Sequence, residues 1–232
     1  MPLSQRSRQA FCISDSPSLF VPEWEEPLLA RALVALALRT SPTICYVGAA
    51  KGDHPDRRLA FYQLAERVNF RPRALNLFTP LTDNPDEYFA DADIVYVDGG
   101  STRNLMVLLR EWRADQALRD AYDRGVILAG ASAGTNMMFE WGLTDSVRTR
   151  IDPIAGLGLL PGTVGIHHDA NAHRPAAFEA FLKDPRATGP AFSIDDGVAL
   201  HFVDGEHVGT WKRHQGADWA RHSLGTEAAV LP

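Results

Sequence analysis

The sequence predicts an α/β protein with a three-layer, doubly wound and mostly parallel sheet and an antiparallel hairpin near its C-terminal end. Short apolar runs alternate with amphipathic stretches of helical length through most of the chain. This alternation is typical of a parallel sheet that is covered by helices on both faces. In the last third, two apolar runs flank the turn Asp204-Gly205-Glu206, a pattern typical of a hairpin.

The elements follow from these runs in order. Strands are expected at residues 43–47, 74–78, 94–97 and 126–129, and the hairpin strands at residues 198–203 and 207–211. Helices are expected at residues 28–38, 58–68, 102–112, 115–124 and 135–141. The first helix has an acidic first turn at Glu25 and Glu26, which suits the helix dipole. Its apolar face consists of Leu28, Leu29, Ala32, Leu33 and Leu36.

Length and composition predict a single domain, residues 1–232, with 45% hydrophobic and 22% charged residues. The net charge of −6 argues against a nucleic-acid partner, because phosphate contacts need clustered Lys and Arg. The two cysteines, Cys12 and Cys45, suit a reducing compartment. The start of the chain has no apolar run of signal-peptide length, and no apolar stretch is as long as a membrane span. We therefore expect a cytoplasmic protein without a membrane partner.

Gly130-Ala131-Ser132-Ala133-Gly134 fits the G-x-S-x-G pattern of a nucleophile elbow. Such a serine lies at the tip of a strained turn between a strand and a helix, and only small neighbours let the two arms approach. The apolar run before the pattern and the expected helix after it provide that setting. Ser132 is therefore the candidate nucleophile, and the backbone N–H of Ala133 is a candidate oxyanion donor.

Gly99 and Gly100 follow the preceding strand. Because the carboxyl ends of parallel strands share one edge, this pair is expected beside the elbow, where it could supply a second oxyanion donor. A tight turn between strand and helix explains the two glycines equally well.

A catalytic serine needs a base, and the base needs an orienting carboxylate. His167 and His168 follow the apolar run at residues 164–166, which places them at the end of a strand. The residues alone leave three carboxylate candidates open, Asp195, Asp196 and Asp145.

A metal site is a further alternative, because four potential ligands lie close together in sequence: His167, His168, Asp169 and His173. No H-E-x-x-H or C-x-x-C pattern accompanies them. We expect no metal and no cofactor.

With these residues in view, the chain resembles the peptidase E family of aspartyl dipeptidases in its short-chain form, with cyanophycinase as a more distant relative. The resemblance runs from about Ser41 to Phe202. Four segments in family order support it: residues 96–102, 130–134, 165–174 and 194–200. Thr144-Asp145-Ser146 also looks like the short-chain members.

The resemblance implies a serine peptidase or amidohydrolase that acts on small peptides through a triad of Ser132, His167 and Asp196. It implies oxyanion donors at Gly100 and Ala133, and a fold like that of the class I glutamine amidotransferases. It also suggests substrate contacts at Gly99 and Arg174. The stretch from His167 to Arg174 is shorter than in peptidase E proper, so the sequence does not carry Asp-X dipeptidase specificity onto Arg174.

Two departures from the family pattern motivate an alternative function. Ser101 replaces the usual Asn, and Thr135 replaces the usual Ala. A member of the same fold that binds peptides or small molecules with little turnover is therefore the second hypothesis. A basic pocket for an acidic substrate would draw on Arg103, Arg148, Arg150 and Arg174. The expected assembly is a monomer or homodimer.

Overall fold

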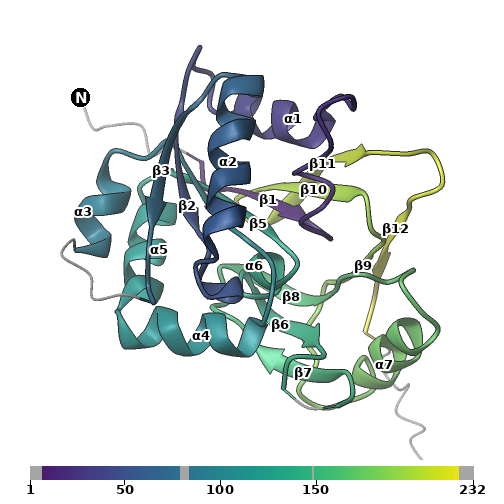
Figure 1. Cartoon of the computed structure of the whole chain (residues 1–232). Helices are drawn as coiled ribbons and strands as arrows, with labels where there is room; N and C mark the ends of the chain where they lie inside the picture. Colours follow the sequence, from purple (N-terminus) through teal and green to yellow (C-terminus); the bar gives the residue numbers. More distant parts are fainter. Residues whose placement is uncertain (1–6, 79–83, 148, 225–232) are drawn as a thin grey trace, which may run out of the picture.

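Two β-sheets form the framework of the protein, whereas the sequence predicted one (Figure 1). The computed structural model describes residues 7–78, 84–147 and 149–224. Its strands are β1 (Gln9–Ile13), β2 (Thr43–Val47), β3 (Arg71–Leu75), β4 (Ile94–Val97), β5 (Ile127–Ala131), β6 (Phe139–Thr144), β7 (Asp152–Ala155), β8 (Leu160–Gly165), β9 (Ala191–Ile194), β10 (Val198–Val203), β11 (Glu206–Lys212) and β12 (Trp219–His222).

The larger sheet has the strand order β11-β10-β1-β5-β4-β2-β3. Its five strands from β1 to β3 are parallel, and β10 and β11 are antiparallel. The hairpin expected at residues 198–203 and 207–211 is present as β10 and β11. The smaller sheet has the order β12-β9-β8-β6-β7, in which β6, β8 and β9 are parallel.

Helices cover both faces of the larger sheet (Figure 1). The side chains of β2 alternate between two apolar clusters, so that Ile44 and Tyr46 pack toward one face and Cys45 and Val47 toward the other. The first face is covered by α1 (Leu28–Leu36) and α2 (Pro55–Val68), and the second by α3 (Pro85–Ala90), α4 (Thr102–Glu111) and α5 (Ala114–Asp123). This is the mixed α/β layering that the sequence predicted; the likeness to class I glutamine amidotransferases stays a prediction.

The smaller sheet packs on the same side of the larger sheet as α4 and α5. Phe139 of β6, Val164 of β8 and Phe192 of β9 belong to the same apolar cluster as Leu128 of β5. The other side of the smaller sheet contacts α7 (His173–Phe181), through Phe178 and Phe181. Two short helices complete the described elements, the 3-10 helix η1 (Ala49–Lys51) and α6 (Ala133–Asn136).

The prediction of a helix at residues 135–141 is wrong. Only the single turn α6 is helical, and the chain then enters strand β6. Residues 139–144 pair with β7 and β8, and the backbone N–H of Leu157 donates to the carbonyl of Met137 at 2.7 Å. Pairing with segments that follow in sequence therefore overrides the local helical pattern.

Expectations for the first helix and for the strand at residues 74–78 are also corrected. The helix expected at residues 28–38 ends at Leu36, and Leu28 is 42% exposed, so it does not lie on the buried face. Glu25 and Glu26 precede this helix, and Glu25 binds Arg213 through hydrogen bonds of 2.6 and 2.7 Å. The strand expected at residues 74–78 is β3, which begins earlier because an edge strand tolerates Pro72 and its polar neighbours.

Strand β1 was not predicted, although it lies between β5 and β10 near the middle of the larger sheet. Its register places Ile13 beside Ala131 of β5. Residue 14 therefore leaves the sheet next to Ser132.

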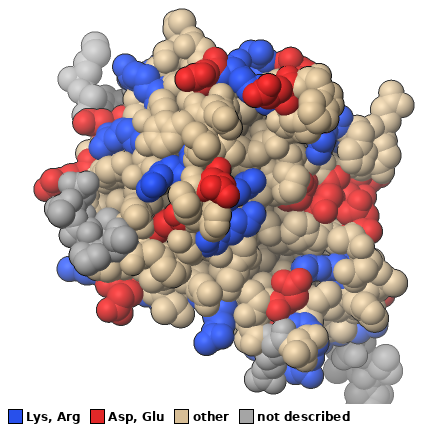
Figure 2. All heavy atoms as spheres, viewed as in Figure 1, with Lys and Arg blue, Asp and Glu red and all other residues tan. Residues whose placement is uncertain are grey.

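Acidic and basic side chains are interspersed over the face seen in Figure 2. Within the described residues, none of the helices is both long enough and apolar enough to cross a bilayer.

Candidate active site

Ser132 lies in the turn between β5 and α6, in a backbone conformation that only small neighbours permit. Its φ is +53° and its ψ is −108°, values that an L-residue adopts only under strain. A Cβ atom at Gly134 would lie 2.0 Å from the carbonyl oxygen of Val97, and one at Gly130 would lie 2.4 Å from the carbonyl carbon of Gly134. The two glycines thus allow the turn to lie against β4. Ser132 itself is partly exposed.

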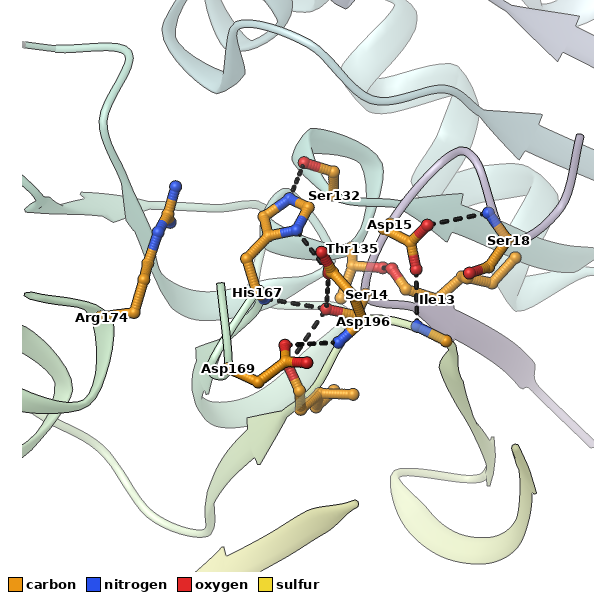
Figure 3. A network of polar contacts seen from close by, with 12 residues as sticks. Ile13, Ser14, Asp15, Ser18, Ser132, Thr135, His167, Asp169, Arg174 and Asp196 are labelled. Carbon is orange, nitrogen blue, oxygen red and sulfur yellow. Dashed lines mark hydrogen bonds and ion pairs between the residues drawn. The ribbon is translucent and has the colours of Figure 1, made fainter. Parts of the chain in front are cut away.

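The imidazole of His167 faces this serine (Figure 3). The distance between Ser132 Oγ and His167 Nε2 is 2.8 Å. His167 follows β8 of the smaller sheet, so the pair joins the two sheets. Its side chain is 21% exposed. The Nε2 atom can therefore accept the proton of the Ser132 hydroxyl while the Nδ1 atom contacts Asp196.

The carboxylate of Asp196 contacts the other ring nitrogen of His167, Nδ1. Its Oδ1 atom lies 2.6 Å from His167 Nδ1. Burial alone would raise the pKa of Asp196, but hydrogen bonds from His167 and Ser14 and the charge of Arg174 lower it overall. The carboxylate therefore stays ionised and keeps the Nδ1 atom as a donor.

The other two carboxylates that the sequence left open are engaged elsewhere. Asp195 accepts the backbone N–H of Asp218 at 3.0 Å. Asp145 binds the guanidinium of Arg174, with 2.7 Å between Oδ2 and Nη2. Of the three candidates, the structure places only Asp196 against His167 among the described residues.

The glycine pair after β4 lies against the nucleophile. A Cβ atom on Gly99 would lie 2.9 Å from the Cβ atom of Ser132, and one on Gly100 would lie 2.3 Å from the carbonyl oxygen of Ala50. Gly100 has a φ of +142°, which glycine tolerates best. In the described parts of the chain, the backbone N–H groups of Gly100 and Ala133 have no acceptor. Both therefore remain candidates for the oxyanion donors that the sequence predicts.

The aspartate before this pair, Asp98, is the centre of a buried polar cluster that sequence reasoning did not assign. Its carboxylate is 0% exposed. It accepts hydrogen bonds from the hydroxyls of Ser16, Tyr46 and Tyr96, at 2.7, 3.0 and 3.0 Å. Burial raises the pKa of Tyr96 well above its ordinary value, so this phenol remains a neutral donor. These hydrogen bonds hold the side chain of Asp98, the residue before Gly99, in one position.

The segment after β1 was also missed, because no motif marks it. Ser14 contacts both His167 and Asp196. The carboxylate of Asp15 accepts the backbone N–H of Gly197 at 2.7 Å, which holds the turn that contains Asp196. The one signal in the sequence is the apolar run at residues 10–13 directly before these polar residues.

Arg174 is drawn with the triad in Figure 3, where no dashed line joins it to Ser132, His167 or Asp196. Its side chain is only 10% exposed, and its Nε atom is buried without an acceptor among the described residues. The charge of Arg174 contributes to the lowered pKa of Asp196.

Among the described residues, neither Arg103 nor Arg150 has a contact with the triad. The side chain of Arg150 is 70% exposed and binds Asp152. Arg103 contacts Ser146 through its backbone N–H. Arg148 lies outside the described residues.

The residues proposed as alternative metal ligands do not form a cluster. Within the described chain, no group of three or more His, Cys, Asp and Glu side chains is arranged to hold a metal ion. Asp169 instead accepts the backbone N–H of Asp196 at 2.9 Å. The ring of His168 meets Phe178 edge to face, with 5.7 Å between centroids.

Comparison with known proteins places the chain in a family. The model of "Peptidase family S51" matches residues 16–209. This match begins before the start expected at about Ser41 and ends after Phe202, but it does not include Ser14 and Asp15. The "Uncharacterized peptidase YgaJ" of Bacillus subtilis (strain 168) is 35% identical over 195 residues, which cover 84% of each chain.

Two solved structures share the fold. A peptidase from an acI-B1 Actinobacterium superposes with a TM-score of 0.65 at 17% identity, over 85% of this chain and 84% of that one. A protein from Listeria monocytogenes EGD-e that is assigned by name to peptidase E gives a TM-score of 0.65 at 15% identity, over 89% of this chain and 98% of that one.

Proposed function

The chain belongs to peptidase family S51, as its resemblance to the peptidase E family predicts, and on this premise we propose that it hydrolyses small peptides through Ser132, His167 and Asp196. The observation that carries the proposal is the continuous chain of hydrogen-bond contacts from Ser132 Oγ through the imidazole to Asp196, with distances of 2.8 and 2.6 Å.

The proposed reaction follows from this chain. Ser132 Oγ attacks the peptide carbonyl carbon as its proton passes to His167 Nε2. The N–H groups of Gly100 and Ala133 bind the oxyanion of the tetrahedral intermediate. The intermediate then expels the amine, which takes the proton from His167, and leaves an acyl group on Ser132. Water, deprotonated by His167, attacks the acyl carbon and releases the acid and the free serine.

The departures from the family pattern do not touch these groups. The Thr135 hydroxyl lies 2.7 Å from the carbonyl oxygen of Ile13 and 2.8 Å from that of Gly130, inside the elbow. The Ser101 hydroxyl accepts the backbone N–H of Asn104 at 3.2 Å, so it caps α4. Both replacements have a local structural role, which supports turnover over a binding role without turnover.

For substrate contacts we propose Gly99 and Arg174. Gly99 lies against Ser132, where a Cβ atom would be 2.9 Å from the Cβ atom of the serine. Arg174 lies near enough to the triad for its charge to lower the pKa of Asp196, and a guanidinium is a group that binds carboxylates. Its pairing with Asp145 already neutralises much of its charge. The proposed substrates are therefore small peptides in general, without a strict requirement for an N-terminal aspartate.

The test compares the unsubstituted protein with Ser132→Ala and His167→Ala on a panel of dipeptides and esters. We expect kcat/KM to fall by about four to six orders of magnitude in both variants. A fluorophosphonate probe should label the unsubstituted protein at Ser132 and leave Ser132→Ala unlabelled. Unchanged hydrolysis in either variant would exclude the mechanism. A folded protein that neither turns over nor reacts with the probe would indicate a binding function instead.

A further inference from the structure

Ser14 lies where β1 leaves the larger sheet, and its side chain is fully buried. Its hydroxyl oxygen accepts the backbone N–H of His167 at 2.8 Å. The same oxygen lies 3.1 Å from Asp196 Oδ1 and 3.0 Å from the carbonyl oxygen of Ile194, so the hydroxyl proton is donated to one of these two acceptors. One hydroxyl thus contacts both the base and the carboxylate (Figure 3).

The residue before Ser14 contacts the nucleophile turn. The carbonyl oxygen of Ile13 accepts the backbone N–H of Ser132 at 3.1 Å and the hydroxyl of Thr135 at 2.7 Å. Two consecutive residues at the end of β1 therefore bind the two halves of the site. These halves come from different sheets, since Ser132 follows β5 and His167 follows β8.

The backbone of His167 needs such support. Its φ is +53°, a left-handed conformation that is unfavourable for a residue with a Cβ atom. Without the Ser14 hydroxyl, the N–H group in this strained turn would have no protein acceptor among the described residues. The hydrogen bond to Ser14 therefore fixes the direction in which the imidazole leaves the chain.

We propose that Ser14 is a positioning residue whose hydroxyl holds His167 and Asp196 at the separation from Ser132 that proton transfer requires. The inference rests on the proposed function, and it assigns a role to a residue outside the three reacting groups. It predicts that loss of the hydroxyl lowers kcat rather than substrate binding, because a small displacement of the base slows proton transfer.

The test uses Ser14→Ala, the conservative variant Ser14→Thr and the control Ser18→Ala. Ser18 is a buried serine of the same segment, and its hydroxyl makes no hydrogen bond within the described residues. We expect kcat to fall about 10- to 100-fold in Ser14→Ala with KM nearly unchanged. Ser14→Thr should recover most of the lost rate, and Ser18→Ala should match the unsubstituted protein.

A spectroscopic signature separates positioning from general destabilisation. The proton between His167 Nδ1 and Asp196 gives a downfield proton NMR resonance when this short hydrogen bond is held in place. We expect the resonance in the unsubstituted protein, Ser14→Thr and Ser18→Ala, and its loss or broadening in a folded Ser14→Ala. A folded Ser14→Ala with unchanged kcat and unchanged resonance would overturn the proposal.

A measurement without substitution covers the case in which Ser14→Ala does not fold. The amide of His167 should exchange with deuterium much more slowly than that of Asp169, whose N–H has no acceptor within the described residues. Equal exchange rates would overturn the role of Ser14. If instead the unsubstituted protein cleaves no peptide and Ser132 resists the fluorophosphonate, the proposed function fails, while the resonance and the exchange rates still decide the position of His167.

Discussion

The carboxylate of Asp98 meets the guanidinium of Arg57 at two points, with 3.1 Å between Nε and Oδ2 and 3.3 Å between Nη2 and Oδ1. The aspartate is completely buried, and Arg57 is 23% exposed. Because Asp98 directly precedes Gly99 and Gly100, this ion pair anchors the turn to which we assign oxyanion binding. Its removal should affect both stability and catalysis.

Replacement of Asp98 by Asn should lower the free energy of unfolding by about 3 kcal/mol at neutral pH, since the partner charge stays half-buried without a counter-ion. Urea unfolding measures the difference, with Asp91→Asn as the control, because Asp91 is exposed and its carboxylate makes no hydrogen bond within the described residues. A loss of the same size in both variants would contradict the assignment.

The effect of Asp98→Asn should also depend on pH. Burial alone would raise the pKa of Asp98, but Arg57 and the Ser16 hydroxyl lower it below its ordinary value. A carboxyl whose pKa is lower in the folded state stabilises the protein above its unfolded pKa, and this contribution disappears as the pH falls through the folded pKa. The stability difference between the two proteins should therefore shrink below about pH 4. A constant difference from neutral to acid pH would count against an ionised Asp98.

Asp196→Asn should reduce kcat by about two to four orders of magnitude on a neutral dipeptide, because an amide holds the wrong tautomer of His167. Asp195→Asn is the matched control, since its carboxylate accepts a backbone N–H away from the imidazole. Steady-state kinetics on both variants shows which of the two adjacent aspartates, Asp195 or Asp196, orients His167. A larger loss in Asp195→Asn would reassign the third group.

The pairing of Asp145 with Arg174 should limit the preference for acidic substrates. We expect the unsubstituted protein to prefer Asp-X over neutral dipeptides by less than about tenfold in kcat/KM, because Asp145 already pairs with the guanidinium of Arg174. Asp145→Asn should increase this preference, and Arg174→Gln should abolish it. A dipeptide library compared across the three proteins measures the ratios, and a preference unchanged by both substitutions would remove Arg174 from the substrate site.

Gly134→Ala should prevent the elbow from forming, because its Cβ atom would lie 2.0 Å from the Val97 carbonyl oxygen. We expect a loss of about 3 kcal/mol in the free energy of unfolding and no detectable labelling of Ser132. Gly216→Ala is the control, since its Cβ atom would lie 3.8 Å from its nearest neighbour. Thermal unfolding and probe labelling report both effects, and a stable, labelled Gly134→Ala would contradict the close contact.

The parts of the fold that the sequence predicted well are those with a strong local pattern. Strands β2 and β4 have the expected bounds because continuous apolar runs form buried strands. The first residues of β6, 139–141, were predicted as the end of a helix, because the strands that pair with β6 follow it in sequence. Strand β1 was missed because five residues before a polar stretch do not reveal a place in the centre of a sheet.

The same division applies to the candidate site. Ser132, His167 and Asp196 each belong to a short segment with a family pattern, so sequence could name them. The contact of Ser14 with Asp196 joins residues 182 positions apart, and no local pattern encodes such a distance. The buried surroundings of Asp98 likewise come from Ser16, Tyr46 and Arg57, which only the folded chain brings together.

The place of β1 has a consequence for how the protein is made. Residue 10 pairs with residue 128 on one side and with residue 202 on the other. Strand β1 therefore cannot pair until β5 and β10, which are translated much later, have left the ribosome. A nascent chain contains the serine and the histidine before it contains Asp196 and the strand that closes the sheet. Pairing over such separations makes folding slow. We therefore expect hydrolytic activity to arise only after β10 has left the ribosome.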